Sequence, residues 1–339
     1  MTDEERSTED KQGGSTLSVA LAFAANLLVG LLKLVAGLLT GSSAMLSEAA
    51  HSAADCMTEL LLFTALRRSG KRPDRVHPFG YGKERFFWAM IAAVSVFVVG
   101  ATYSVFEGIL TVIEQPRDPA EEQYAWVAYA VLGLSVVIEG TSWQQALRQV
   151  LREKRELGLP LVRYLRLSDD PTVKSVLYED TAAIIGLVFA LAGVALHQAT
   201  GSSVWDGIAS ILIGLLLAFV AFVLGRTNKD LLIGRSAEPR VMRAVYEHLD
   251  DAPEVDAVVD LQSMLTGTDS VLLCARVDFV DDVSAADLEK ACVRLDEELH
   301  DRFPDLDQIF IQPVPRTDPA TRAAVLERYG AVPDGRRPE

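Results

Sequence analysis

The chain has 339 residues and a mass of 36.9 kDa, half of its residues are hydrophobic, and its net charge is −15 at pH 7. Because 23% of the residues are charged, a mean hydropathy of +0.20 requires apolar residues to be segregated along the chain. The acidic balance excludes a nucleic-acid-binding protein, which needs a basic face, and the segregation excludes a soluble enzyme.

The first two thirds of the chain contain long apolar stretches. Each is long enough, at about 1.5 Å of rise per residue, to cross about 30 Å of hydrocarbon as a helix. The sequence therefore predicts a six-helix transmembrane domain over residues 15–225. The six stretches are 17–38, 43–66, 86–113, 124–146, 176–197 and 204–225.

The loops between these stretches alternate in positive charge. Segments 67–85 and 148–174 each carry seven Lys or Arg residues, whereas 39–42, 114–123 and 198–203 together carry only Arg117. Because positive loops stay in the cytoplasm, both termini are expected to be cytoplasmic. Residues 1–14 are polar and acidic, which predicts a disordered tail and not a signal peptide. The bias towards Arg, Ala and Val suggests a bacterial plasma membrane protein.

The composition changes after residue 225. Residues 226–339 contain 24 acidic and 14 basic side chains and no long apolar run. Their pattern predicts a helix at 241–249, strands at 255–264 and 270–280, a helix to about residue 302 and a strand at 308–313. Ser284 and Asp287 form a capping box that opens the second helix. We expect a cytoplasmic α+β domain of ferredoxin-like pattern over 226–315, and a tail over 316–339 with one helix followed by disorder.

The second apolar stretch contains four ionisable residues, Glu48, His51, Asp55 and Glu59. His51 and Asp55 are four residues apart and share one helical face, where an imidazole and a carboxylate can ligate one divalent transition metal. The alternative is a His–Asp hydrogen bond between packed helices. Ionisable groups in a membrane are costly and indicate function, so the metal interpretation is favoured.

The fifth stretch supplies a possible partner. Asp180 lies about 15 Å into that helix from the cytoplasmic side, and Asp55 lies about 18 Å into its own. Two buried carboxylates at one depth stay ionised only with a cation between them, either a metal or protons. Glu179 points about 100° away from Asp180 and is a candidate ligand, outer partner or helix contact.

Other polar residues in the spans carry weaker predictions. Glu139, in the fourth stretch, could reach the same polar centre. Lys33 shares a helical face with Asn26 and is expected to extend towards the membrane surface. Asp206 is expected to cap the helix that it opens.

Three stretches resemble the cation diffusion facilitator family of metal/proton antiporters. The first is GSSAMLSE at 41–48, which leads into His51 and Asp55; the second is HPFGYGKE at 77–84; and the third is LYEDTAA at 177–183. Together with LIGRS at 232–236, the third stretch looks most like the subgroup that contains the ninth human zinc transporter. The similarity covers nearly the whole chain.

The resemblance implies a homodimer that exports Zn²⁺, or Mn²⁺, Fe²⁺, Co²⁺ or Ni²⁺, in exchange for protons by alternating access. It implies that His51, Asp55 and Asp180 are ligands between the second and fifth helices, with the metal as cargo and no resident cofactor. Many zinc members carry His or Asp at the position that Val176 occupies here. The fourth ligand is then water, Glu179 or another carboxylate. Candidates for an outer shell or proton path are Glu48, Glu139, Asp74 and His77.

Two further metal sites of some family members are incomplete in this sequence. In the loop after the second helix, Asp74 and His77 match, but Tyr81 replaces a second His. The C-terminal domain contains only His248 and His300, so we interpret it as a dimerisation module.

Two other functions fit parts of the sequence. In a membrane-anchored metal sensor the helices would only anchor the chain, which would not require the charges of the second stretch. An intramembrane metalloprotease would need an HExxH motif, and the segment from His51 to Asp55 lacks the second His.

Overall fold

The computed structural model describes residues 23–115, 119–156, 158, 160–161 and 171–329. These residues form two compact units. The first contains the described residues up to Arg68 together with Glu84–Lys229, and the second contains Ser69–Lys83 and the described residues from Asp230 onward. The predicted tail at 1–14 and residues 330–339 of the predicted tail at 316–339 lie outside the described residues.

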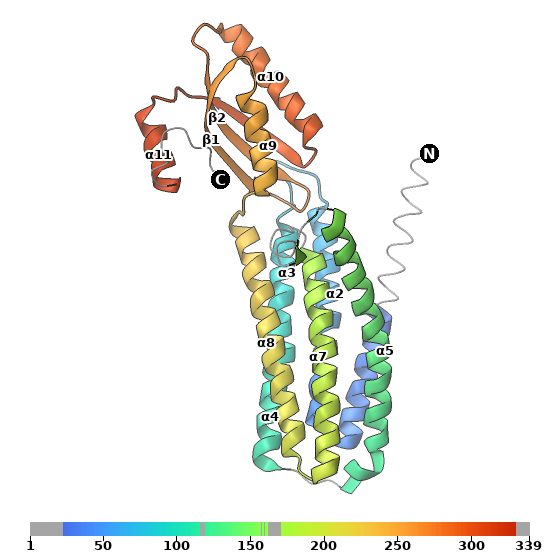
Figure 1. Cartoon of the computed structure of the whole chain (residues 1–339). Helices are drawn as coiled ribbons and strands as arrows, with labels where there is room; N and C mark the ends of the chain where they lie inside the picture. Colours follow the sequence, from blue (N-terminus) through green and yellow to red (C-terminus); the bar gives the residue numbers. More distant parts are fainter. Residues whose placement is uncertain (1–22, 116–118, 157, 159, 162–170, 330–339) are drawn as a thin grey trace, which may run out of the picture. The chain divides into compact units, whose positions relative to one another are not determined.

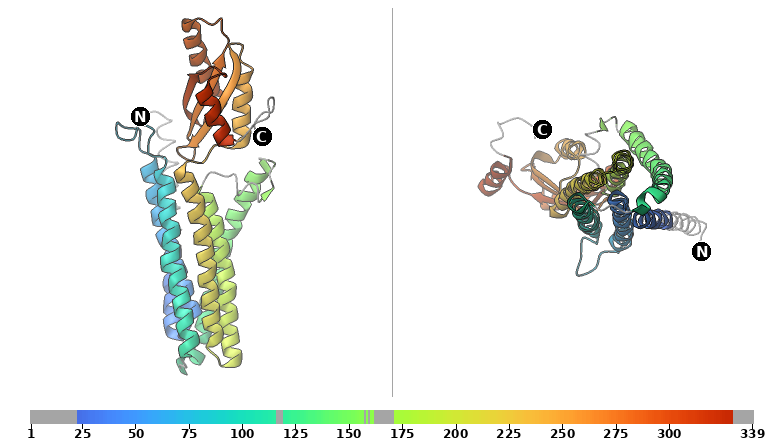
Figure 2. Two further views of the ribbon diagram at one scale, coloured as in Figure 1. Left: turned by 90° about the vertical axis from the view of Figure 1, so that its left-hand side faces the viewer. Right: turned by 90° about the horizontal axis from the view of Figure 1, so that it is seen from below.

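The first unit is a bundle of long helices that run side by side (Figures 1 and 2). The chain passes through a helix at Phe23–Thr40 and then through six labelled elements and one π-helical segment. They are α2 (Ser43–Ser69), α3 (Glu84–Ser95), η1 (Val96–Ala101), α4 (Thr102–Glu114), α5 (Pro119–Glu156), α7 (Pro171–Thr200) and α8 (Val204–Ile233).

Five helices of the described residues are long and apolar enough to cross a membrane. They are Phe23–Thr40, Glu84–Glu114, Tyr124–Arg155, Val176–Thr200 and Val204–Ile233. The second of the six predicted spans, α2, has 27 residues and is long enough, but it is more polar than these five because it carries Glu48, Asp55 and Glu59. Length and apolarity thus support an integral membrane protein with five clear spans among the described residues. The helix α2 is comparably long but more polar.

The third span is not one regular α-helix. Residues Val96–Ala101 form a π-helical segment between α3 and α4, and Thr102 donates its hydroxyl to the Phe97 carbonyl at 3.0 Å. Such segments re-aim the side chains that follow them. A Cβ added at Gly100 would lie 2.9 Å from Leu217 Cδ1, so this segment packs tightly on α8.

Small residues allow the helices to approach closely. A Cβ added at Gly108 on α4 would lie 2.6 Å from the Gly207 carbonyl oxygen, and one at Gly207 would lie 2.8 Å from the Gly108 carbonyl oxygen. The backbones of α4 and α8 are therefore in direct contact. In lipid, where the hydrophobic effect does not drive helix association, such close packing is the main source of attraction.

Asp206 does not cap its own helix, which corrects the prediction. It accepts hydrogen bonds from the Ser42 hydroxyl at 2.8 Å, the Ser43 hydroxyl at 2.9 Å and the Ala44 N–H at 3.2 Å. These groups belong to the N-terminus of α2, whose free N–H groups and positive dipole end favour a carboxylate. Asp206 therefore caps α2 from α8 and joins the two helices.

The second unit follows the predicted order of elements. It contains α9 (Pro239–Asp250), β1 (Val255–Leu265), β2 (Val271–Phe279), α10 (Ala285–Arg302), β3 (Leu306–Pro313) and α11 (Pro319–Tyr329). In the sheet, β2 lies between an antiparallel β1 and a parallel β3. The Ser284 side chain accepts the Asp287 N–H at 3.2 Å, which confirms the predicted cap of α10.

One face of β2 forms the core of this unit. Leu273, Ala275 and Val277 alternate along the strand and are fully buried, together with Leu249 of α9 and Leu295 of α10. Burial on alternate residues is what a strand with one covered face requires.

The segment Ser69–Lys83 belongs to the second unit although it joins α2 to α3. A Cβ added at Gly82 would lie 2.4 Å from the Thr266 carbonyl oxygen and 2.8 Å from Gly267 Cα, so backbones touch at this point. Lys83 Nζ lies 3.5 Å from Met264 Sδ. The segment therefore packs on the turn between β1 and β2.

Candidate metal site

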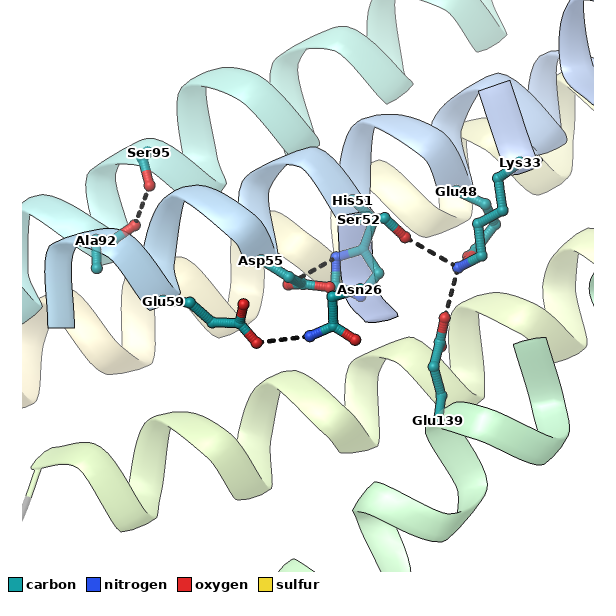
Figure 3. Close-up of polar contacts among 10 residues, drawn as sticks. All are labelled: Asn26, Lys33, Glu48, His51, Ser52, Asp55, Glu59, Ala92, Ser95 and Glu139. Carbon is teal, nitrogen blue, oxygen red and sulfur yellow. Dashed lines mark hydrogen bonds and ion pairs between the residues drawn. The ribbon is translucent and has the colours of Figure 1, made fainter. Parts of the chain in front are cut away.

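On the face of α2 that the sequence singled out, Glu48 and His51 are buried, whereas the Asp55 side chain is 25% exposed. His51 is 1% exposed, and its Nδ1 lies 3.7 Å from Asp55 Oδ1 (Figure 3). That distance is too long for a hydrogen bond, and both ring nitrogens of His51 and the Asp55 Oδ1 are buried without a hydrogen-bond partner. The alternative of a His–Asp hydrogen bond is therefore not formed in this structure.

Asp180 is held by α5. Its Oδ2 accepts a hydrogen bond from the Ser142 hydroxyl at 2.9 Å. One residue further along each helix, Trp143 Nε1 donates to the Thr181 hydroxyl at 3.1 Å. Asp180 also lies within electrostatic range of His51 and Asp55. Its carboxylate is thus oriented by a neighbouring helix near the α2 pair.

The structure gathers only part of the predicted ligand set. Among the described residues, no group of three His, Cys, Asp or Glu side chains is close enough to hold one ion. Glu179 has a buried Oε1 without a hydrogen-bond partner and lies within electrostatic range of Asp55 and Asp180. A metal ligated by both helices would require α2 and α7 to bring these side chains closer together.

Lys33 does not extend to the membrane surface, which corrects the prediction. Its side chain is completely buried, and its ammonium lies 2.9 Å from Glu48 Oε2 and 2.7 Å from Glu139 Oε1 (Figure 3). It also donates to the Ser52 hydroxyl at 3.2 Å. Glu48 and Glu139, the candidate outer-shell groups, therefore share one buried cation.

A second link between the first helix and α2 lies nearer the C-terminal end of α2. Asn26 Nδ2 donates to Glu59 Oε1 at 2.6 Å (Figure 3). Asn26 and Lys33 thus share a helical face, as predicted, and both contact carboxylates of α2.

Asp74 and His77 belong to the second unit, whereas His51 and Asp55 belong to the first. Asp74 accepts the N–H groups of Val76 and His77 at 2.8 and 2.7 Å and the Tyr81 hydroxyl at 2.7 Å. The His77 N–H, the Tyr81 hydroxyl and the Val76 N–H lower the pKa of the Asp74 carboxyl. Tyr81 therefore closes the loop with a hydrogen bond.

Two residues at the site were not predicted as part of it, Ser142 and the buried Lys33. Ser142 lies three residues after Glu139, so both face the same side of α5 and the spacing could have revealed it. Lys33 was noted, but the sequence could not show that carboxylates from two helices meet at its ammonium.

Comparison with known proteins decides the family. Residues 19–233, more than half of the chain, match the cation efflux transmembrane domain family. The chain belongs to the cation efflux family.

Relatives of this cation efflux protein include named transporters. It is 36% identical over 262 residues to the proton-coupled zinc antiporter SLC30A9, mitochondrial, of Xenopus laevis, and 34% identical over 262 residues to the human protein of that name. Each match covers 77% of this chain but only 46% and 45% of the relative, so the chain spans about half the length of these relatives. It is also 25% identical over 247 residues to the manganese efflux system protein MneP of Bacillus subtilis, covering 70% of this chain and 76% of MneP.

Proposed function

We propose that this protein exports Zn²⁺ across a membrane in exchange for protons, with His51, Asp55 and Asp180 as metal ligands. The proposal rests on the unpaired groups of α2. Buried polar atoms without hydrogen bonds are costly, and His51 presents two such nitrogens beside an Asp55 oxygen with the same deficit. A divalent cation satisfies both residue types at once.

The exchange follows from the chemistry of these ligands. Metal ligation requires a neutral imidazole and ionised carboxylates, so binding of metal expels protons and protonation expels metal. An imidazole titrates near physiological pH, which makes His51 the proposed main proton carrier. Glu179 or water completes the ligand set, because Val176 offers no ligand atom one turn before Asp180.

The α2 helix is the proposed sixth span. Its 27 residues extend about 40 Å, enough to cross a bilayer. The positive loops at its end and after α5 support the proposal that both termini are cytoplasmic. We further propose a homodimer in which the α+β unit, ferredoxin-like and cytoplasmic, pairs with its copy.

Metal-driven proton flux tests the proposal. The purified protein is placed in liposomes that contain a pH dye, and Zn²⁺ is added outside. Asp180→Asn should abolish the flux because it removes a ligand charge, and Glu114→Gln, an exposed carboxylate at the end of α4, should retain it. Equal flux in the wild type and Asp180→Asn would remove Asp180 from the ligand set.

Mn²⁺ is the second candidate cargo. The relative MneP is named as a manganese efflux protein, and a site with one imidazole and several carboxylates suits Mn²⁺ as well as Zn²⁺. The same assay run with each metal identifies the cargo. Absence of any metal-driven flux from correctly inserted protein would favour the metal-sensor function.

A further inference from the structure

The buried ammonium of Lys33 occupies a shell of oxygen atoms. An ammonium has three N–H donors, and three acceptors surround this one: Glu48 Oε2, Ser52 Oγ and Glu139 Oε1, at 2.9, 3.2 and 2.7 Å. They come from α2 and α5, whereas Lys33 comes from the first helix (Figure 3). We call Lys33, Glu48, Ser52 and Glu139 the lysine shell.

The lysine shell has more acceptor capacity than Lys33 uses. Glu48 Oε1 and Glu139 Oε2 are buried without a hydrogen-bond partner. The two carboxylates carry two negative charges and Lys33 supplies one positive charge. These two oxygen atoms are therefore available as ligands for a further cation.

A glycine on α7 shapes the remaining side of the shell. A Cβ added at Gly186 would lie 2.5 Å from Glu48 Oε1, so only a glycine leaves room for that oxygen. The unpaired oxygen thus has a defined place against a third helix.

We propose that Glu48, Ser52 and Glu139 of the lysine shell form a second cation site, suited to a divalent ion that prefers oxygen ligands. In the native protein the ammonium of Lys33 occupies this site. Two carboxylates and a hydroxyl are the ligands that Mn²⁺ or Mg²⁺ prefers. Because two buried carboxylates repel each other unless a cation lies between them, removal of the lysine charge leaves a vacancy that a divalent ion fills. Lys33 cannot diffuse away, so it leaves exchangeable metal to His51 and Asp55, which lie further along the same face of α2.

A purely structural role for Lys33 makes a different prediction. An ion triad that only joins helices would lose stability when Lys33 is replaced, but it would bind no new ion. The number of bound ions therefore separates the two roles. Counting ions does not require transport, so the result can be interpreted even if the proposed export function is wrong.

The experiment counts Mn²⁺ bound to the full-length protein in detergent, by equilibrium dialysis and by the electron paramagnetic resonance of bound Mn²⁺. Lys33→Met in an Asp180→Ala background should bind one more Mn²⁺ per protomer than Asp180→Ala alone. Adding Glu48→Gln and Glu139→Gln should remove that ion. Lys33→Arg, which keeps the charge, and Lys71→Met, which removes an exposed charge in the loop after α2, should leave the count unchanged.

The same Mn²⁺ count in Lys33→Met and in its Asp180→Ala parent would overturn the proposal. If Lys33→Met is unstable without metal, the melting temperature supplies a second measurement. Mn²⁺ should then raise it by several degrees in Lys33→Met and leave it unchanged when Glu48→Gln and Glu139→Gln are added. An equal rise in both variants would also contradict the proposal.

Discussion

The helices α2 and α8 are of similar length, 27 and 30 residues, but they bury opposite kinds of side chain. Six of the thirteen buried residues of α2 are polar or ionisable, including Glu48, His51 and Ser52. In contrast, α8 buries mainly Ile, Leu, Val and Ala, such as Ile213, Leu217 and Leu224. Because apolar surface does not drive association in lipid, α8 relies on close packing, while α2 relies on charge and hydrogen bonds.

This difference supports the proposal that the chemistry lies on α2 and the scaffold on α8. A polar helix can stay in a bundle only if other helices satisfy its polar and charged groups. The first helix does so with Asn26 and Lys33, and α8 does so with Asp206. Each of these contacts can be broken in turn.

The largest effect is expected when the ion triad loses its cation. Lys33→Leu leaves the carboxylates of Glu48 and Glu139 buried without a counter-charge and should destabilise the bundle by about 3–5 kcal/mol, the range for an uncompensated buried charge. The measurement is the free energy of unfolding in detergent micelles, without added metal. A cost below about 1 kcal/mol would show that the two carboxylates find protons, water or another partner.

A smaller cost is expected from the cap between α8 and α2. Asp206→Ala leaves the Ser42 and Ser43 hydroxyls and the Ala44 N–H without their acceptor and should cost about 2–3 kcal/mol by the same measurement. Asp206→Asn keeps one acceptor oxygen and should cost less. Equal losses in both variants would mean that the charge, and not the hydrogen bonds, is decisive.

Glycine positions provide a matched test on α7 and α8. Gly186→Ala places a methyl group 2.5 Å from Glu48 Oε1, and the forced displacement should cost about 1–2 kcal/mol. Gly225→Ala on α8 meets nothing within 4 Å and should change stability by less than about 0.5 kcal/mol. If both variants behave alike, the Glu48 carboxylate is not confined by α7.

The smallest effect concerns pH and the loop between α2 and α3. Hydrogen bonds lower the pKa of Asp74 below its unfolded value of about 3.9, so its stabilisation is complete above that value and is lost as pH falls through the folded pKa. Proteolysis of the loop should therefore be unchanged from pH 8 to pH 5, and Asp74→Asn should increase it throughout. If proteolysis of the wild-type loop became much faster between pH 7 and pH 5, a group other than Asp74 would be holding the loop closed.

The sequence predicts most of this architecture because the relevant signals are local. Apolar runs predict five of the spans, and alternation in residues 255–280 predicts the strands. The i, i+4 spacing of His51 and Asp55 predicts their shared face, since a helix fixes that relation regardless of its neighbours.

Contacts between distant segments could not be predicted in this way. The side chain of Lys33 is long enough either to reach the membrane surface or to bind carboxylates, and only the packing of α2 and α5 decides. Asp206 has the spacing of a cap for its own helix, yet the N-terminus of α2 competes for its carboxylate and binds it instead. The candidate ligands Asp55 and Asp180 share a predicted depth, but their approach depends on how α2 and α7 pack.

The central claim is that the buried, unpaired face of α2 binds the exported metal. The most direct measurement is Zn²⁺ binding by the full-length protein at equilibrium, compared with His51→Ala. We predict that wild-type protein binds Zn²⁺ with release of protons, and that His51→Ala loses both the high-affinity binding and the proton release while remaining folded. Unchanged Zn²⁺ affinity and proton release in a folded His51→Ala variant would contradict the account.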